Sequence, residues 1–172
     1  AGHLYTYEGS KLQTRRLLLK HADRTLRISD MLEGQNGMIW LSTNEGIRLI
    51  HPEWELLPFP TPEAQIQALG QLGDGTLVAG TNKGCYRLDV RNGWQLVDGS
   101  STSFNVLCLT EDGAGGLWAG TFGEGVFSIN PKGRLLGIGG SSKASNYNTN
   151  VFSIEKAPSP NTWYLGTLGG IY

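Results

Sequence analysis

The sequence predicts an all-β protein built from repeated four-stranded antiparallel sheets, and three observations support this fold class. One pattern recurs four times along the 172 residues. Within each copy, apolar and polar residues alternate with a period of two, and β-branched and aromatic side chains are frequent, as in strands rather than helices. The chain also contains 25 glycines without a collagen-like period, which indicates many tight turns.

The first strand of each copy is an apolar run that ends at a turn rich in Gly, Asp or Asn. Glycines in turns such as residues 73–75 and 112–116 can adopt the positive φ that tight hairpins require. The first strands contain Ile28 and Met31, Ile66 and Leu69, Val106, Leu107 and Leu109, and Val151, Phe152 and Ile154.

The second strand of each copy ends at a threonine, and a glycine opens the third strand a few residues later. Small residues in the second strand let neighbouring sheets approach closely. The tryptophans are expected to recur at one position and to fill the contact between sheets. The residues that define the repeat are Trp40, Thr43, Gly46, Thr81, Gly84, Trp118, Thr121, Gly125, Trp163, Thr167 and Gly170.

The spacing of the four threonines, 38, 40 and 46 residues, is that of β-propeller blades. Helical repeats of similar length are excluded by the period-two alternation. A fourth strand fits residues 54–59, 94–97 and 134–138, so that each full repeat is one four-stranded blade. The repeats then cover residues 28–59, 66–97, 106–138 and 151–172 of a single domain, residues 1–172.

Two partial blades flank the three complete ones. Residues 2–7 and 13–19 match the third and fourth strands of a preceding blade, and the repeat at 151–172 lacks a fourth strand. Either the strand at residues 15–19 closes a small four-bladed ring, or the chain is part of a larger propeller of the seven-bladed type; the second reading is favoured. Open edge strands also predict self-association, for example of two copies into an eight-bladed ring.

Composition and charge exclude several classes of partner. The formal net charge is −1, with 14 Lys and Arg against 15 Asp and Glu, so no overall field attracts nucleic acid or an anionic membrane. No apolar run is long enough to cross a bilayer. Cys85 and Cys108, each flanked by apolar or aromatic residues, are expected to be free thiols rather than a disulfide.

No motif in the chain indicates catalysis, a metal ion or a cofactor. His3, His21 and His51 are not at ligand spacing from one another or from a Cys or carboxylate. Aspartates in the Gly-rich turns are explained by hydrogen bonds to their own backbone. Residues 139–143 lack the spacing of a phosphate loop.

Residues 106–129 show the repeat most clearly: an apolar strand, an Asp-Gly turn, then Trp118, a small residue, Gly120 and Thr121. This pattern resembles the two-component regulator propeller repeat over nearly the whole chain. Departures are Ser42 in place of Gly, Val78 in place of Trp, and residues 157–161 in place of an Asp-Gly turn. The resemblance implies the periplasmic or extracytoplasmic sensor region of a hybrid two-component system protein, which responds to glycan fragments.

The resemblance also implies where a ligand binds, because the segments between blades and the turns between second and third strands share one face. Amide, hydroxyl and aromatic groups there suit sugar hydroxyls. A non-catalytic sensor with an oligosaccharide ligand is the first reading, a protein-interaction scaffold the second, and a carbohydrate-active enzyme the third. The candidate ligand-binding residues are His21, Asp23, Arg24, Glu45, Lys83, Phe122, Glu124, Asn146, Tyr147 and Asn148.

Overall fold

The computed structural model describes residues 4–8, 11–15, 20–21, 24–35, 37–50, 56–137 and 149–172. These residues form nineteen strands and no helix, so the predicted all-β fold is confirmed. No helix that could span a membrane occurs among them.

Three sheets have four antiparallel strands in the order in which they follow along the chain, which is the arrangement of a propeller blade. Blade A contains β5 (Ile28–Glu33), β6 (Ile39–Thr43), β7 (Gly46–Ile50) and β8 (Leu56–Pro58). Blade B contains β9 (Ile66–Gln71), β10 (Leu77–Thr81), β11 (Gly84–Asp89) and β12 (Gly93–Leu96). Blade C contains β13 (Val106–Glu111), β14 (Leu117–Thr121), β15 (Val126–Ile129) and β16 (Leu135–Gly137).

Three shorter sheets complete the described strands. Blade D has only β17 (Val151–Lys156), β18 (Trp163–Thr167) and β19 (Gly170–Ile171). Near the N-terminus, β1 (Leu4–Glu8) pairs antiparallel with β2 (Lys11–Arg15). A two-residue ladder of β3 (Lys20–His21) and β4 (Arg24–Thr25) lies where the sequence indicates a joining loop, because a ladder this short leaves no alternating pattern.

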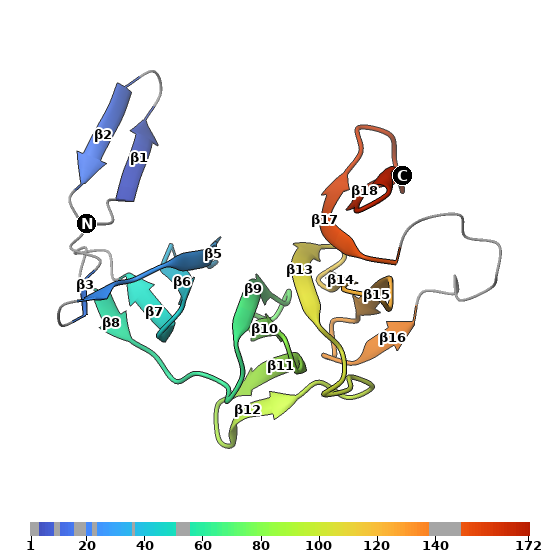
Figure 1. Ribbon diagram of the computed structural model, residues 1–172, viewed down its shortest axis with the longest axis horizontal. Helices are drawn as coiled ribbons and strands as arrows, with labels where there is room; N and C mark the ends of the chain where they lie inside the picture. Colours follow the sequence, from blue (N-terminus) through green and yellow to red (C-terminus); the bar gives the residue numbers. More distant parts are fainter. Residues whose placement is uncertain are drawn as a thin grey trace.

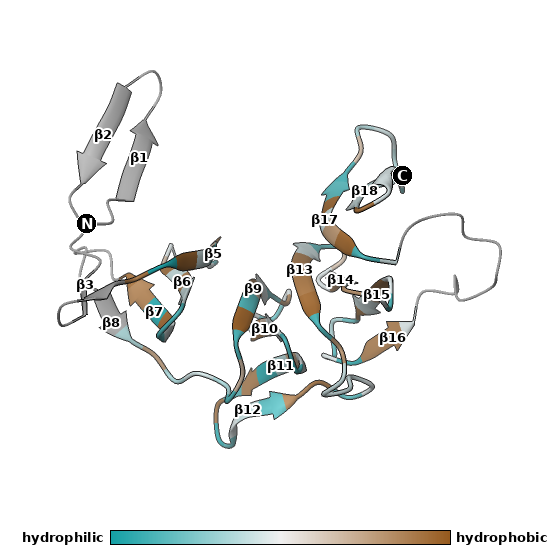
Figure 2. Cartoon of the chain, in the orientation of Figure 1, coloured by the Kyte–Doolittle hydropathy of each residue, from teal (hydrophilic) through white to brown (hydrophobic). Residues whose placement is uncertain are grey.

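Blades A to D follow one another along an arc, with their first strands β5, β9, β13 and β17 side by side on its inner side (Figure 1). Three hydrophobic clusters among the described residues each contain residues of two neighbouring blades: one joins A to B, one B to C and one C to D. Figure 2 shows hydrophobic segments on β9, β13 and β17, where successive blades meet. The core therefore lies between blades, and burial of apolar surface there holds the arc together.

The tryptophans do not share one position, which corrects the expectation from the sequence. Trp40 and Trp118 lie three residues before their threonines, whereas Trp163 lies four before Thr167. Successive residues of a strand point to opposite faces, so Trp118 faces blade D and Trp163 faces blade C. Their rings meet edge to face, with centroids 5.8 Å apart.

The first strand of each blade carries a bulge that the sequence did not indicate. The register with the second strand shifts between Ile28 and Asp30, Val106 and Cys108, and Val151 and Ser153, and the same pairing is interrupted at Thr81 in blade B. One residue is left unpaired at each shift, which bends the strand near its start.

Candidate functional site

One edge of the blades, which we call the loop face, holds both the turns between second and third strands and the segments that precede the first strands. A backbone hydrogen bond joins the two in every blade. The bonds are Asn44 N to Arg27 O at 3.0 Å, Asn82 N to Gln65 O at 3.1 Å, Phe122 N to Asn105 O at 2.8 Å and Leu168 N to Asn150 O at 3.3 Å. The two kinds of loop therefore share a face, as the family resemblance implies.

The repeated threonine stabilises the conformation of the turns on the loop face. In blade B the buried Thr81 hydroxyl donates to Gly84 O at 2.8 Å and accepts from Lys83 N at 3.0 Å. Gly84 has a φ of 96° and lies so close to Ser101 O that a Cβ atom would be 2.6 Å from it. A threonine and a left-handed glycine are thus both required to present Lys83 at this edge.

The structure brings four of the candidate ligand-binding residues to the loop face. Glu45, Lys83, Phe122 and Glu124 all lie in its turns. The Glu45 carboxylate lies 3.6 Å from the Arg48 guanidinium.

The other six candidates are described only in part or not at all. The backbones of His21 and Arg24 lie in β3 and β4, and their side chains are not described. Asp23, Asn146, Tyr147 and Asn148 lie outside the described residues, so their proposed role stays a prediction.

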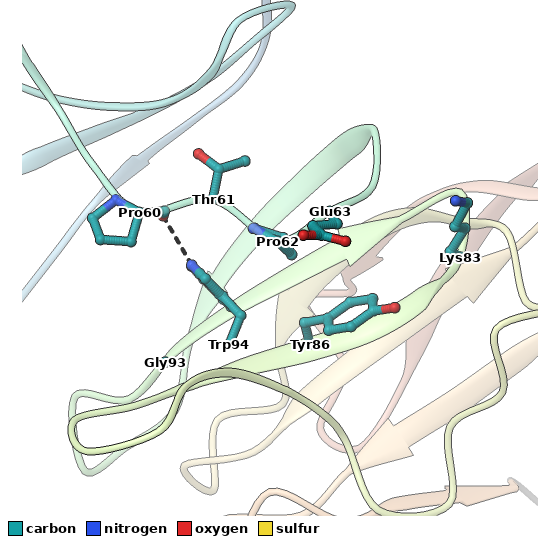
Figure 3. A pocket seen from close by; sticks show the side chains of 8 residues that line it. All are labelled: Pro60, Thr61, Pro62, Glu63, Lys83, Tyr86, Gly93 and Trp94. Atoms are coloured by element: carbon teal, nitrogen blue, oxygen red, sulfur yellow. Dashed lines mark hydrogen bonds between the residues drawn. The ribbon is translucent and has the colours of Figure 1, made fainter.

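A groove of about 590 Å³ lies between the segment that leaves blade A and the outer strands of blade B. In Figure 3, Pro60 lies at one end of this groove and Lys83 at the other, with Trp94, Glu63 and Tyr86 between them. The lining residues are Pro60, Thr61, Pro62, Glu63, Lys83, Tyr86, Gly93 and Trp94.

Both aromatic rings of the groove come from one face of blade B. In the β11–β12 ladder Tyr86 pairs with Leu96 and Leu88 with Trp94, so Tyr86 and Trp94 are diagonal neighbours on the same face. The Trp94 indole N–H donates to Pro60 O at 2.8 Å, which ties the ring to the opposite wall. Leu88 and Trp94 pack against the hydrophobic cluster between blades A and B, so this wall is anchored in the core.

The wall from blade A is fixed by Thr61. Its hydroxyl accepts from Ile47 N at 2.9 Å and donates to Phe59 O at 3.1 Å. Pro60 and Pro62 restrict the backbone φ on either side of Thr61. The segment is therefore held in place before any ligand arrives, which lowers the entropy lost on binding.

The groove combines two aromatic rings with hydrogen-bonding groups of different kinds. Lys83 supplies a cationic donor, Glu63 an anionic acceptor, and Tyr86 a hydroxyl that both donates and accepts. Glu63 and Lys83 are exposed, and the rings are half-buried. Such a site can bind a polar ligand that carries hydroxyl groups and one apolar face.

Sequence reasoning missed most of this groove. It placed Trp94 in a fourth strand and Glu63 in a joining loop, but it gave no reason to bring them together. The prolines at 60 and 62 were the available signal, because they predict a stiff segment in a loop that is otherwise polar.

Two kinds of chemical group can be assessed among the described residues: clusters that could hold a metal ion, and cysteine thiols. No group of three or more His, Cys, Asp or Glu side chains that could hold a metal ion is present among them. Cys85 and Cys108 are free thiols, as predicted. Burial raises the pKa of the Cys85 thiol to about 12 and that of Cys108 to about 11, so both are protonated at neutral pH.

Comparison with known proteins places the chain among propellers of known structure. No protein-family model and no curated protein sequence matches it. The extracellular domain of a hybrid two-component system protein from B. thetaiotaomicron is 22% identical, with a TM-score of 0.69, covering 98% of this chain and 24% of that one. A second such domain from B. thetaiotaomicron is 19% identical, with a TM-score of 0.63, covering 94% of this chain and 22% of that one.

An enzyme structure is also similar. Virginiamycin B lyase from Staphylococcus aureus is 14% identical, with a TM-score of 0.64, covering 99% of this chain and 61% of that one. At these identities the similarities show the fold, and they confirm the predicted propeller architecture. This chain spans about a quarter of the length of the two extracellular domains, which are of the class that the repeats resemble.

Proposed function

We propose that this chain is a ligand-binding part of the extracytoplasmic sensor region of a two-component signalling protein, and that it acts by binding rather than by catalysis. The observation that carries the proposal is the pre-formed groove between the segment leaving blade A and the outer strands of blade B, lined by Glu63, Tyr86 and Trp94 and, at its loop-face end, by Lys83. The similarity of the fold to extracellular domains of hybrid two-component systems supports the sensor role and a periplasmic or extracytoplasmic location. This support is an analogy of fold.

The proposed ligand is a glycan fragment. A sugar ring presents an apolar face to an aromatic side chain and hydroxyl groups around its edge. Tyr86 and Trp94 supply rings on the same wall, while Glu63 and Lys83 supply an acceptor and a donor for hydroxyl groups. The groove of about 590 Å³ is within the size range of small-molecule sites.

Calorimetric titration and thermal unfolding with a panel of neutral, amino and uronate oligosaccharides test this proposal. A ligand present at one hundred times its Kd stabilises the folded state by about 2.7 kcal/mol, which raises the unfolding midpoint. Lys83→Ala and Glu63→Gln should each weaken binding at least several-fold without lowering the midpoint of the free protein, because both side chains are exposed. Lys132→Ala, an exposed lysine in the turn before β16, is the matched control.

Two results would contradict the proposal. One is the absence of a response to any oligosaccharide in the panel. The other is a response that Lys83→Ala and Glu63→Gln leave equal to that of Lys132→Ala, because binding would then lie elsewhere on the molecule.

A protein-interaction scaffold is the second candidate, and one observation favours it. Phe122 and Leu168 directly follow the threonines of blades C and D on the loop face, and they are 53% and 70% exposed. Exposed apolar side chains on one face can take part in protein contacts. The scaffold role is supported if no oligosaccharide binds and if the wild type, but not the Phe122→Ser/Leu168→Ser variant, retains a protein partner on an affinity column.

The groove gives less support to a carbohydrate-active enzyme. Glycoside hydrolysis ordinarily uses two carboxyl groups that flank the bond to be cleaved. Among the described residues that line the groove, Glu63 is the single carboxylate. Incubation of the oligosaccharide panel with the chain should therefore leave every substrate intact.

A further inference from the structure

The segments that join blade A to blade B and blade B to blade C begin in the same way. We call them the AB connector, residues 59–65, and the BC connector, residues 97–105. In each, the first residue donates its backbone N–H to the third strand of the preceding blade, and a hydroxyl group further along accepts from the same residue of that strand. The bonds are Phe59 N to Ile47 O at 3.1 Å and Ile47 N to Thr61 Oγ1 at 2.9 Å, then Val97 N to Cys85 O at 2.9 Å and Cys85 N to Ser100 Oγ at 3.0 Å.

The connectors also end in the same way, so the residues near their ends can be compared directly. The last residue of each, Gln65 or Asn105, accepts a backbone hydrogen bond from the turn between the second and third strands of the next blade. The residue before it is Ala64 in the AB connector and Phe104 in the BC connector. An alanine therefore stands where the other joint has an aromatic residue.

In the joint between blades B and C, the Phe104 ring covers the third strand of blade C. It is stacked on Phe127, with ring centroids 4.9 Å apart and 29° between the ring planes. Both rings pack against the hydrophobic cluster between these two blades. The connector thus contributes an aromatic ring to the core of this joint.

In the joint between blades A and B, Tyr86 takes the position of Phe127. Each is the second residue after the glycine that opens the third strand, Gly84 in blade B and Gly125 in blade C. The aromatic ring pairs of the described residues do not include Tyr86. Its side chain lines the open groove instead (Figure 3).

The groove lies beside Ala64 in the chain. Pro62 and Glu63, which directly precede Ala64, line the groove together with Tyr86. The methyl group of an alanine cannot cover an aromatic ring as the side chain of Phe104 does. The space that a connector ring fills at one joint is therefore left open at the other.

We propose that the groove contains a ring-binding subsite over Tyr86, and that Ala64 is the specificity-determining residue that keeps it open. This inference rests on the proposed function and names the part of the ligand that the groove selects. That part is a single pyranose ring, whose apolar face stacks on Tyr86 as the Phe104 ring stacks on Phe127. Glu63 and Lys83, which line the same groove, bind hydroxyl groups at the edge of the sugar ring.

A double-mutant cycle without ligand tests whether a ring at position 64 reaches Tyr86. We expect Ala64→Phe to raise the urea midpoint of unfolding, and to raise it much less in the Tyr86→Leu background, because the new ring stacks on Tyr86. Ala114→Phe, at an exposed alanine in the turn between β13 and β14, should raise the midpoint in neither background. A midpoint that Ala64→Phe lowers, as overpacking would, or raises equally in both backgrounds would overturn the inference.

Calorimetric titration with the oligosaccharide that binds the wild type best tests whether the ligand occupies the same space. Ala64→Phe should weaken binding at least tenfold, because its ring fills the subsite, and Tyr86→Leu should weaken binding several-fold, because it removes the stacking surface. Ala114→Phe should bind like the wild type.

The outcomes of the titration separate this inference from the proposed function. Binding that Ala64→Phe leaves unchanged would overturn the ring-binding subsite while oligosaccharide binding itself stands. A wild type that binds no oligosaccharide would overturn the proposed function, and with it the assignment of a sugar ring to the space over Tyr86. Weakened binding of Ala64→Phe, together with the midpoint that depends on Tyr86, supports the subsite.

Discussion

The threonine that closes each second strand makes two hydrogen bonds in the turn that follows it. Its hydroxyl donates to the carbonyl of the glycine that opens the third strand, at 2.7, 2.8, 2.8 and 3.0 Å from blade A to blade D. The same oxygen accepts a backbone amide of the turn, at distances of 3.0 to 3.2 Å. A hydroxyl is needed because valine, of the same shape, can do neither.

Replacement of Thr121 by valine should therefore destabilise the protein. The hydroxyl is buried, so Gly125 O and Glu124 N lose a partner that water cannot easily replace. We expect the free energy of unfolding to fall by about 1–3 kcal/mol in urea titrations. Thr167→Val is the matched control: its bonds lie in an exposed turn, and its cost should be clearly smaller.

Because of the two buried thiols, we expect the free energy of unfolding to depend on pH. The ordinary pKa of a cysteine thiol is 9.0, and burial raises it to about 12 for Cys85 and about 11 for Cys108. Above pH 9.0 the unfolded chain releases protons that the folded chain retains. The unfolded state then binds fewer protons, so the free energy of unfolding decreases as the pH rises towards 11.

Urea titrations of the wild type and of a Cys85→Ala/Cys108→Ala variant at several pH values above 9.0 measure this effect. The wild type should lose stability more steeply than the variant, by up to about 1.4 kcal/mol per pH unit for each thiol. Comparison of slopes removes the constant cost of the cavities. Equal slopes would show that the thiols ionise alike in the folded and unfolded chains.

At the scale of the strand, neighbouring blades can approach each other closely because glycine, which has no side chain, lies where they meet. Gly120 in β14 lies against the first strand of blade D, and a Cβ atom there would be 2.6 Å from Cys108 Sγ and 2.9 Å from Val151 Cγ1. Gly120→Ala should lower the free energy of unfolding by about 1–3 kcal/mol because it overpacks the joint. Gly137→Ala, in outer strand β16 with open space at its Cβ position, should have little effect.

The joint between blades C and D can be tested by removing one of its two large rings. Trp163→Ala should cost about 3 kcal/mol and loosen blade D. Hydrogen exchange followed by mass spectrometry should then accelerate in residues 151–172 more than in blade B. Leu168→Ala, in an exposed turn of the same blade, should leave exchange unchanged. Uniform acceleration throughout the chain would contradict a local role for Trp163.

The strands themselves could be predicted from the sequence, because their signals are local. Apolar and polar residues alternate along each strand, and Gly and Thr recur at the strand ends. The side to which a residue points was less predictable. A shift of one position relative to Thr167 places Trp163 on the face opposite to that of Trp118, although both precede a Gly-Thr pair in similar sequences. The bulge in each first strand was likewise unforeseen, since it depends on pairing with the second strand.

At the scale of the whole molecule, the arc of blades creates sites that no single repeat contains. The groove joins Pro60 to Trp94, which are 34 residues apart and belong to segments of different blades. Lys83 could be proposed from the sequence because every blade presents a turn residue on the loop face. Glu63 and Tyr86 could not, because their proximity depends on how blade B packs against the segment leaving blade A.

The central claim is that a ligand binds in the groove between the segment leaving blade A and the outer strands of blade B. Hydrogen exchange of the chain with and without the oligosaccharide that binds best in calorimetry tests this claim most directly. The account predicts slower exchange in the segments 61–63 and 83–94, which contain lining residues of the two walls. Slower exchange confined to the turns at 72–76 and 111–116, at the opposite edge of blades B and C, would contradict it.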